Sequence, residues 1–149
     1  MEYPSIYFMR HAESLFNRYG SQEKDCAITS EGQQQASQVN GHYDLVVCSP
    51  MLRCRQTLSS SKITYDKIIY DVDCREHMTS NCDFLDHEEI KNESKNDLYT
   101  RINKLREKLL EYSKNYKKIL VLSHYVFINH YTYGQLRLKN TEIQQNRVV

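Results

Sequence analysis

Residues suited to phosphate chemistry follow three of four short apolar runs in this sequence of 149 residues. Guanidinium groups present paired N–H donors in a planar geometry that suits phosphoryl oxygens. A neutral imidazole can attack phosphorus and carry the phosphoryl group, while a second imidazole shares the charge of the transferring oxygens. The residues are Arg10 and His11 after residues 6–9, Ser49 and Arg53 after residues 44–48, and Ser123 and His124 after residues 119–122.

This chemistry also needs a carboxylic acid. The acid protonates the departing alkoxide and later deprotonates the water that cleaves the phosphohistidine. Glu76, in the sequence CREH just beyond the apolar run 67–70, is the best placed candidate.

The elements that must position these residues alternate along the chain. The runs 6–9, 44–48, 67–70 and 119–122 are too short for core helices and predict buried strands, and the polar stretch 71–96 predicts a loop. This alternation indicates an α/β fold with a mostly parallel sheet, whose ligands bind where strand carboxyl ends meet helix amino ends. The predicted helices cover residues 30–39 with Thr29 or Ser30 as cap, 51–60 with Pro50 in the first turn, 98–112 with Ser94 or Asn96 as cap, and 125–134 ended by Gly134.

Composition narrows the function classes. The length indicates one domain over residues 1–149, and a net charge of +1 gives no basic field for nucleic acid. No apolar run is long enough for a membrane span, and no basic region precedes an apolar stretch at the N-terminus, so we expect a cytoplasmic protein. Five cysteines without a C-x-x-C pair predict reduced thiols. Four glycines cannot form a G-x-x-x-x-G-K or G-x-G-x-x-G loop, which argues against ATPases and dinucleotide oxidoreductases.

Several ordered motifs together resemble the histidine phosphatase superfamily, whose fold is phosphoglycerate-mutase-like. They span almost the whole chain. The resemblance implies a three-layer α/β/α sandwich with a mostly parallel central sheet. The motifs are FMRHAES at residues 8–14 with Asn17, ITSEGQQQA at 28–36, SPMLRCRQT at 49–57, VLSH at 121–124 and NTEI at 140–143.

The resemblance also implies roles for single residues. It makes His11 the nucleophile, assigns Arg10, Asn17, Arg53 and His124 to the phosphate pocket, and gives Glu76 the position of proton donor. The residues after Glu76 differ from the family pattern, so Asp83, Glu88 and Glu89 stay open as alternative donors. The implied activity is metal-independent phosphomonoester hydrolysis through a covalent phosphohistidine, without a cofactor, on a phosphorylated small molecule or a phosphoprotein. A phosphohistidine or phosphoprotein phosphatase, a mutase-type transferase and an inactive phosphate-binding module are the alternatives.

Two kinds of departure from the family bear on the substrate. Ala12 and Tyr125 stand where relatives usually have glycine, and the tyrosine ring is expected to line the pocket or restrict the leaving group. Little chain remains for a helical lid, which predicts an open pocket. An open pocket favours modest selectivity or a protein-borne phosphate over the metabolic mutases.

Other reactive patterns are weaker. A cysteine phosphatase needs C-x-x-x-x-x-R, but Cys54 occupies the position where Cys48 would require the arginine. The run at residues 86–89 and the pair His124 and His130 lack a closed metal-ligand spacing, so we expect no metal site there. Arg55 is expected to be a solvated charge on another helix face than Arg53.

Overall fold

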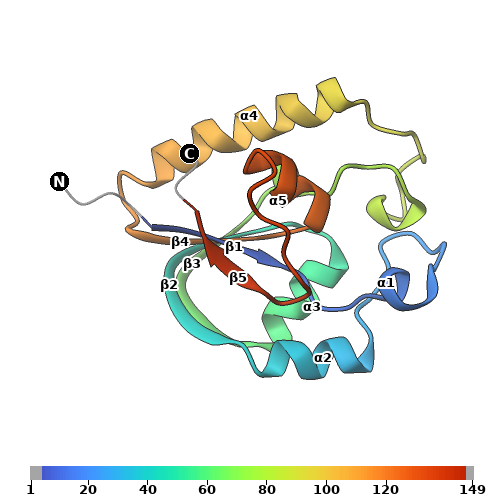
Figure 1. Ribbon diagram of the computed structural model, residues 1–149, viewed down its shortest axis with the longest axis horizontal. Helices are drawn as coiled ribbons and strands as arrows, with labels where there is room; N and C mark the ends of the chain where they lie inside the picture. The colour runs from blue at the N-terminus through green and yellow to red at the C-terminus, as the bar shows by residue number, and fades with distance from the viewer. Residues whose placement is uncertain (1–4, 147–149) are drawn as a thin grey trace.

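The computed structural model describes residues 5–146 of the chain (Figure 1). The strands are β1 Ser5–Arg10, β2 Asn40–Cys48, β3 Lys62–Tyr70, β4 Lys118–Ser123 and β5 Ile143–Gln145. The helices are α1 Leu15–Tyr19, α2 Ser30–Ser37, α3 Leu52–Ser60, α4 Lys95–Tyr112 and α5 Tyr125–Tyr131, and two 3-10 turns are η1 Val72–Cys74 and η2 Asn81–Asp83. The expectation about the N-terminus concerns residues 1–4, which lie outside the described range.

The five strands form one sheet in the order β3-β2-β4-β1-β5. All neighbouring pairs are parallel except β1 and β5, which are antiparallel. Arg10 at the end of β1 is in register with Ser123 of β4, and Cys48 of β2 is in register with Leu122. The carboxyl ends of β2, β4 and β1 therefore lie side by side, as the sequence predicted.

Helices cover both faces of the sheet (Figure 1). Strand residues alternate between two apolar clusters, so that Phe8 packs with residues of α4 and α5 while its neighbour Met9 packs with residues of α3. Burial on both faces explains why the central strands are continuously apolar. The arrangement confirms the predicted α/β/α sandwich with a mostly parallel sheet.

The apolar stripe of α4 points into this core. Leu98, Ile102, Leu105 and Leu109 are all buried. Ser94 caps the helix, because its side chain accepts a hydrogen bond from the backbone N–H of Asp97. The alternative cap Asn96 lies within the helix instead.

Several predicted boundaries were wrong. β2 begins at Asn40 and β3 at Lys62, earlier than the predicted runs 44–48 and 67–70. The first residues of the two strands pair with each other at the sheet edge, which extends both strands. Pro50 precedes the cap residue Met51 and so lies outside the first turn of α3. Two helices are shorter than predicted: α2, which Thr29 caps, ends at Ser37, and α5 ends at Tyr131.

Other elements were not predicted at all. The short β5 and α1 carry no periodic apolar pattern. The predicted loop 71–96 contains η1 and η2, and its last two residues already belong to α4. Within the described residues, no helix combines the length and the apolar character needed to cross a membrane. All five cysteines are buried free thiols.

Candidate active site

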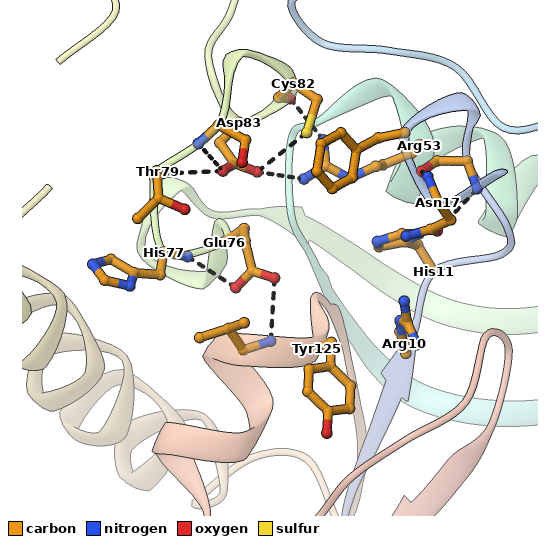
Figure 2. A pocket seen from close by; sticks show the side chains of 14 residues that line it. Arg10, His11, Asn17, Arg53, Glu76, His77, Thr79, Cys82, Asp83 and Tyr125 are labelled. Atoms are coloured by element: carbon orange, nitrogen blue, oxygen red, sulfur yellow. Dashed lines mark hydrogen bonds and ion pairs between the residues drawn. The ribbon is translucent and has the colours of Figure 1, made fainter. Parts of the chain in front are cut away.

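A cavity of about 370 Å³ opens where β1 and β2 end (Figure 2). Five of the six predicted site residues line it, namely Arg10, His11, Asn17, Arg53 and Glu76. The sixth, His124, is fully buried behind the cavity wall, with its ring centroid 5.2 Å from that of His11. The structure thus brings all six residues to one place.

His11 has the tautomer that a nucleophile needs. Its Nδ1 lies 2.7 Å from the carbonyl oxygen of Ala12, and because a carbonyl only accepts hydrogen bonds, Nδ1 carries the proton. The lone pair is therefore on Nε2. Burial, together with the positive charges of Arg53 and Arg10, holds the pKa of His11 well below its ordinary value. The lowered pKa favours the neutral imidazole.

Residues from three other motifs hold the loop that carries His11. The backbone N–H of Ala12 donates to the Thr57 hydroxyl at 2.8 Å, and that of His11 donates to the Ser123 carbonyl at 3.2 Å. The Asn140 amide donates to the His11 carbonyl at 3.0 Å. These contacts give the three motifs a structural part in positioning His11.

His124 lies deeper than His11. Its Nε2 is 2.8 Å from the Ser49 hydroxyl, and its buried Nδ1 has no hydrogen-bond partner among the described residues. Burial and the nearby Arg53 charge lower the pKa of His124 well below its ordinary value. Within the same range of the chain, the buried Nε of Arg10 also lacks a partner. The unpaired Nε–H of Arg10 is a donor, and unpaired buried polar atoms are costly, so this corner of the protein is suited to a ligand that bears acceptor oxygens.

The two arginines are engaged very differently. The buried Arg53 donates from one terminal nitrogen to the Cys82 carbonyl at 2.8 Å and from the other to the Asp83 carboxylate at 3.0 Å. Arg10 donates a hydrogen bond to the Leu138 carbonyl and lies over the ring of Tyr125. Arg10 thus keeps more of its N–H donors for a ligand.

Asn17 is oriented by the first turn of α1. Its side-chain oxygen accepts hydrogen bonds from the Ser14 backbone N–H at 3.1 Å and from the Asn140 amide at 3.3 Å. The NH₂ group of the Asn17 amide then remains as a donor at the cavity wall.

Backbone N–H groups hold the carboxylate of Glu76, which is half-buried. One carboxylate oxygen accepts from the backbone N–H groups of His77 and Phe127 at 2.9 and 2.8 Å, and the other accepts from that of Val126 at 3.1 Å. Burial raises the pKa of Glu76, while these hydrogen bonds oppose the rise. A raised pKa favours the protonated form that a proton donor needs.

The alternative acids are less suited to proton transfer. Asp83 lines the cavity, but its carboxylate accepts from Arg53 and from two backbone N–H groups. Glu88 pairs with Arg75, which lowers the pKa of Glu88 to about 2. Glu89 is exposed and does not line the cavity. Geometry favours Glu76.

Sequence reasoning missed part of the cavity wall. Phe16, His77, Thr79, Ser80 and Cys82 line it, and residues 77–83 come from the stretch that was expected to be only a loop. No pattern in the sequence marks these positions. Tyr125 does line the wall, and the departure from the family glycine was the signal for it.

Other reactive side chains lie outside the cavity wall. Cys54 is buried, and desolvation raises its pKa to about 12, which makes it a poor nucleophile. Arg55 is exposed, as expected. Among residues 5–146, no group of three His, Cys, Asp or Glu side chains is arranged to hold a metal ion.

Known structures share the fold. Phosphoglycerate mutase from Thermus thermophilus is 21% identical, with a TM-score of 0.63 over 92% of this chain and 88% of that one. Alpha-ribazole phosphatase from Shigella flexneri is 18% identical, with a TM-score of 0.65 over 84% of this chain and 76% of the phosphatase chain. The phosphohistidine-phosphatase-type protein SixA from Nakamurella multipartitia is 16% identical, with a TM-score of 0.59. The alignment covers 89% of this chain and 66% of the SixA chain. No curated protein matched the sequence.

The family comparison agrees with the site geometry. Residues 6–92 match the model of the histidine phosphatase superfamily, branch 1, and this range includes Arg10, His11, Arg53 and Glu76. His124 lies beyond the matched range but beside His11 in space. The match covers more than half of the chain, and so the chain belongs to the histidine phosphatase superfamily.

Proposed function

We propose that this protein is a phosphomonoester hydrolase that acts through a covalent phosphohistidine at His11. The observation that carries the proposal is the neutral imidazole of His11, whose Nε2 lone pair is left free by the bond from Nδ1 to the Ala12 carbonyl. Arg10, Asn17 and Arg53 stand beside it in the same cavity. Such donors stabilise the oxygens of a phosphoryl group during transfer.

The reaction has two steps. In the first, Nε2 of His11 attacks phosphorus, the ester P–O bond breaks, and protonated Glu76 gives its proton to the leaving oxygen. In the second, the Glu76 carboxylate takes a proton from water, the water oxygen attacks phosphorus, and the bond to His11 breaks to release phosphate. His124, neutral and next to His11, shares the charge on the transferring oxygens. No step uses a metal ion or a cofactor.

The substrate class in this proposal is a phosphorylated small molecule or a phosphoprotein. Superfamily members are phosphatases or mutases. Hydrolysis is the proposed reaction because it needs only water as the acceptor of the phosphoryl group.

Hydrolysis of a generic aryl phosphate in the presence of a chelator tests the proposal. We expect turnover by the wild-type protein, none by His11→Ala, and full activity in a control variant, His42→Ala, whose ring is exposed and pairs with Asp66 outside the cavity. Turnover that needs a divalent metal, or that persists in His11→Ala, would contradict the mechanism.

Labelling with 32P-substrate tests the intermediate directly. Rapid denaturation is expected to trap an acid-labile label on the wild-type protein and none on His11→Ala. An acid-labile label that remains in His11→Ala would place the nucleophile on another residue.

A further inference from the structure

Asp83 gives the cavity a charge balance that limits its substrates. It occupies η2, its side chain is 5% exposed, and it forms an ion pair with Arg53 at 3.0 Å. Figure 2 shows its carboxylate between Arg53 and the backbone of Thr79, across the cavity from Tyr125. The carboxylate is fully used, because Thr79 and Ser80 donate to its second oxygen at 3.1 and 3.0 Å.

The positive charge of the cavity lining does not exceed the negative charge that one phosphate brings. Among residues 5–146, Arg10 and Arg53 are the only arginine or lysine side chains that line this cavity, and Asp83 offsets one of them. With Glu76 protonated, as its role as donor requires, the lining keeps one unbalanced positive charge. A phosphate monoester already brings up to two negative charges at neutral pH.

We infer that Asp83 is a specificity-determining residue that excludes phosphomonoesters bearing a second anionic group, and that the substrate carries a neutral group beyond its phosphate. With Arg10 engaged by the phosphate, a carboxylate or second phosphate would meet no further arginine or lysine free of a carboxylate partner at the described cavity wall and would face the Asp83 charge instead. Building a repulsive element against the wrong ligand is a general way to obtain specificity. This inference rests on the proposed function for the position of the phosphoryl group at His11.

A matched pair of substrates tests the inference. Glycerol 3-phosphate and 3-phosphoglycerate are nearly the same size, but only the second has a carboxylate. At the pH of maximal activity, where Glu76 is protonated and His11 is neutral, we expect kcat/KM for glycerol phosphate to be higher by about tenfold or more, since charges in a partly buried site interact at an effective dielectric constant of about 20. Equal values, or a preference for phosphoglycerate, would overturn the inference without any variant.

Variants assign the effect to Asp83. In Asp83→Asn the preference is expected to fall to about threefold or less, chiefly through a lower KM for phosphoglycerate, because the Arg53 charge is then unbalanced. Glu89→Gln removes the same charge from an exposed site in the same segment and is expected to keep the wild-type preference. Asp83→Glu keeps the charge and is expected to restore the preference. A loss of activity that is equal for both substrates in Asp83→Asn would make Asp83 structural only.

Binding separates this inference from the proposed function. His11→Ala cannot form the phosphohistidine, so calorimetry on it measures the binding of both intact esters. Tighter binding of glycerol phosphate supports the inference even if the wild-type protein hydrolyses neither ester, in which case only the hydrolase proposal fails. Equal binding overturns the inference whether or not hydrolysis is seen.

Discussion

The half-buried carboxyl of Glu76 has two successive tasks in the proposed reaction, and the two can be separated by the choice of leaving group. An alkyl leaving group needs a proton, whereas a nitrophenolate leaves without one. In Glu76→Gln we therefore expect kcat for glycerol phosphate to fall about 10²- to 10⁴-fold, the usual contribution of general acid–base catalysis.

With 4-nitrophenyl phosphate the same variant is expected to show a burst. Attack by His11 still proceeds, but no base activates water, so one equivalent of nitrophenolate is released and phosphoenzyme accumulates. Stopped-flow absorbance measures the burst, and Glu89→Gln is the control because its side chain lies outside the cavity. Steady turnover at the wild-type rate in Glu76→Gln would mean that Glu76 does not act in the second step.

The two shifted pKa values predict a bell-shaped pH profile for glycerol phosphate. His11 must be neutral, and burial lowers its pKa, so activity is lost only when the pH falls below this lowered value. Glu76 must be protonated, and burial raises its pKa, so activity is lost as the pH rises through the raised value. kcat/KM measured from about pH 4 to 9 reports both limbs. Glu76→Gln is expected to lose the alkaline limb of the profile. An alkaline limb that persists unchanged in this variant would mean that another group titrates there.

At the scale of elements, α4 positions the segment that carries Glu76. Arg101 donates to the backbone carbonyls of Asp73, Arg75 and Glu76 and forms an ion pair with Glu93, whose side chain is 5% exposed. Removing one partner of a buried pair leaves the other charge uncompensated.

Arg101→Met is therefore expected to lower the free energy of unfolding by about 3 kcal/mol and to reduce kcat through a misplaced Glu76. Urea denaturation and kinetics at a temperature where the variant is folded measure the two effects. Lys104→Met removes a positive charge from an exposed position of the same helix and is expected to change neither. An Arg101→Met protein with unchanged stability and normal kcat would show that the segment carrying Glu76 keeps its position without Arg101.

Gly32 sets how closely α2 approaches the chain after His11. A Cβ at this position would fall on the carbonyl oxygen of Glu13, which is a backbone atom and cannot move away easily. Gly32→Ala is expected to cost about 1–3 kcal/mol of stability, as overpacking does. Gln33→Ala, on the exposed side of the same helix, is the control. A Gly32→Ala protein with unchanged stability and kcat would show that α2 can shift without disturbing His11.

The elements that the sequence predicted best are those marked by an unbroken apolar run or by a periodic apolar stripe. The central strands and α4 are buried by their own apolar side chains, so their residues mark them. The short β5 forms by pairing Ile143 with Met9 at the sheet edge, and α1 forms through the reciprocal cap between Ser14 and Asn17. Such contacts depend on the rest of the fold, and hence no local sequence pattern predicts β5 or α1.

At the scale of the whole molecule, the sheet order explains why the site was predictable. Parallel neighbours β2, β4 and β1 bring Ser49, His124 and His11 together from far apart in the chain, and each stands at the end of a recognisable apolar strand. The wall from residues 77–83 was not predictable. Long-range pairs place it, above all Arg53 with Asp83 and Arg75 with Glu88, and a sequence does not reveal which charges will pair.

Ligand binding should be visible in the stability of the entire fold. Arg10 Nε is a buried donor without a partner among the described residues, so an anion that satisfies it binds the folded state alone. Orthovanadate at 100 times its Kd is expected to stabilise the protein by about 2.7 kcal/mol, which corresponds to a rise in Tm of about 5–10 °C for a domain of this size. Differential scanning fluorimetry measures the shift.

Two arginine variants, measured in the same way, test whether vanadate binds in the cavity. Arg10→Met removes donors from the cavity, and we expect it to lose most of the vanadate-induced rise in Tm. Arg55→Met removes an exposed arginine from α3, next to the cavity helix residue Arg53 but outside the lining, and is expected to keep the full rise. If both variants lost the rise equally, vanadate would be binding through the general charge of the surface, and the unpaired buried Nε of Arg10 would have no part in holding an anion.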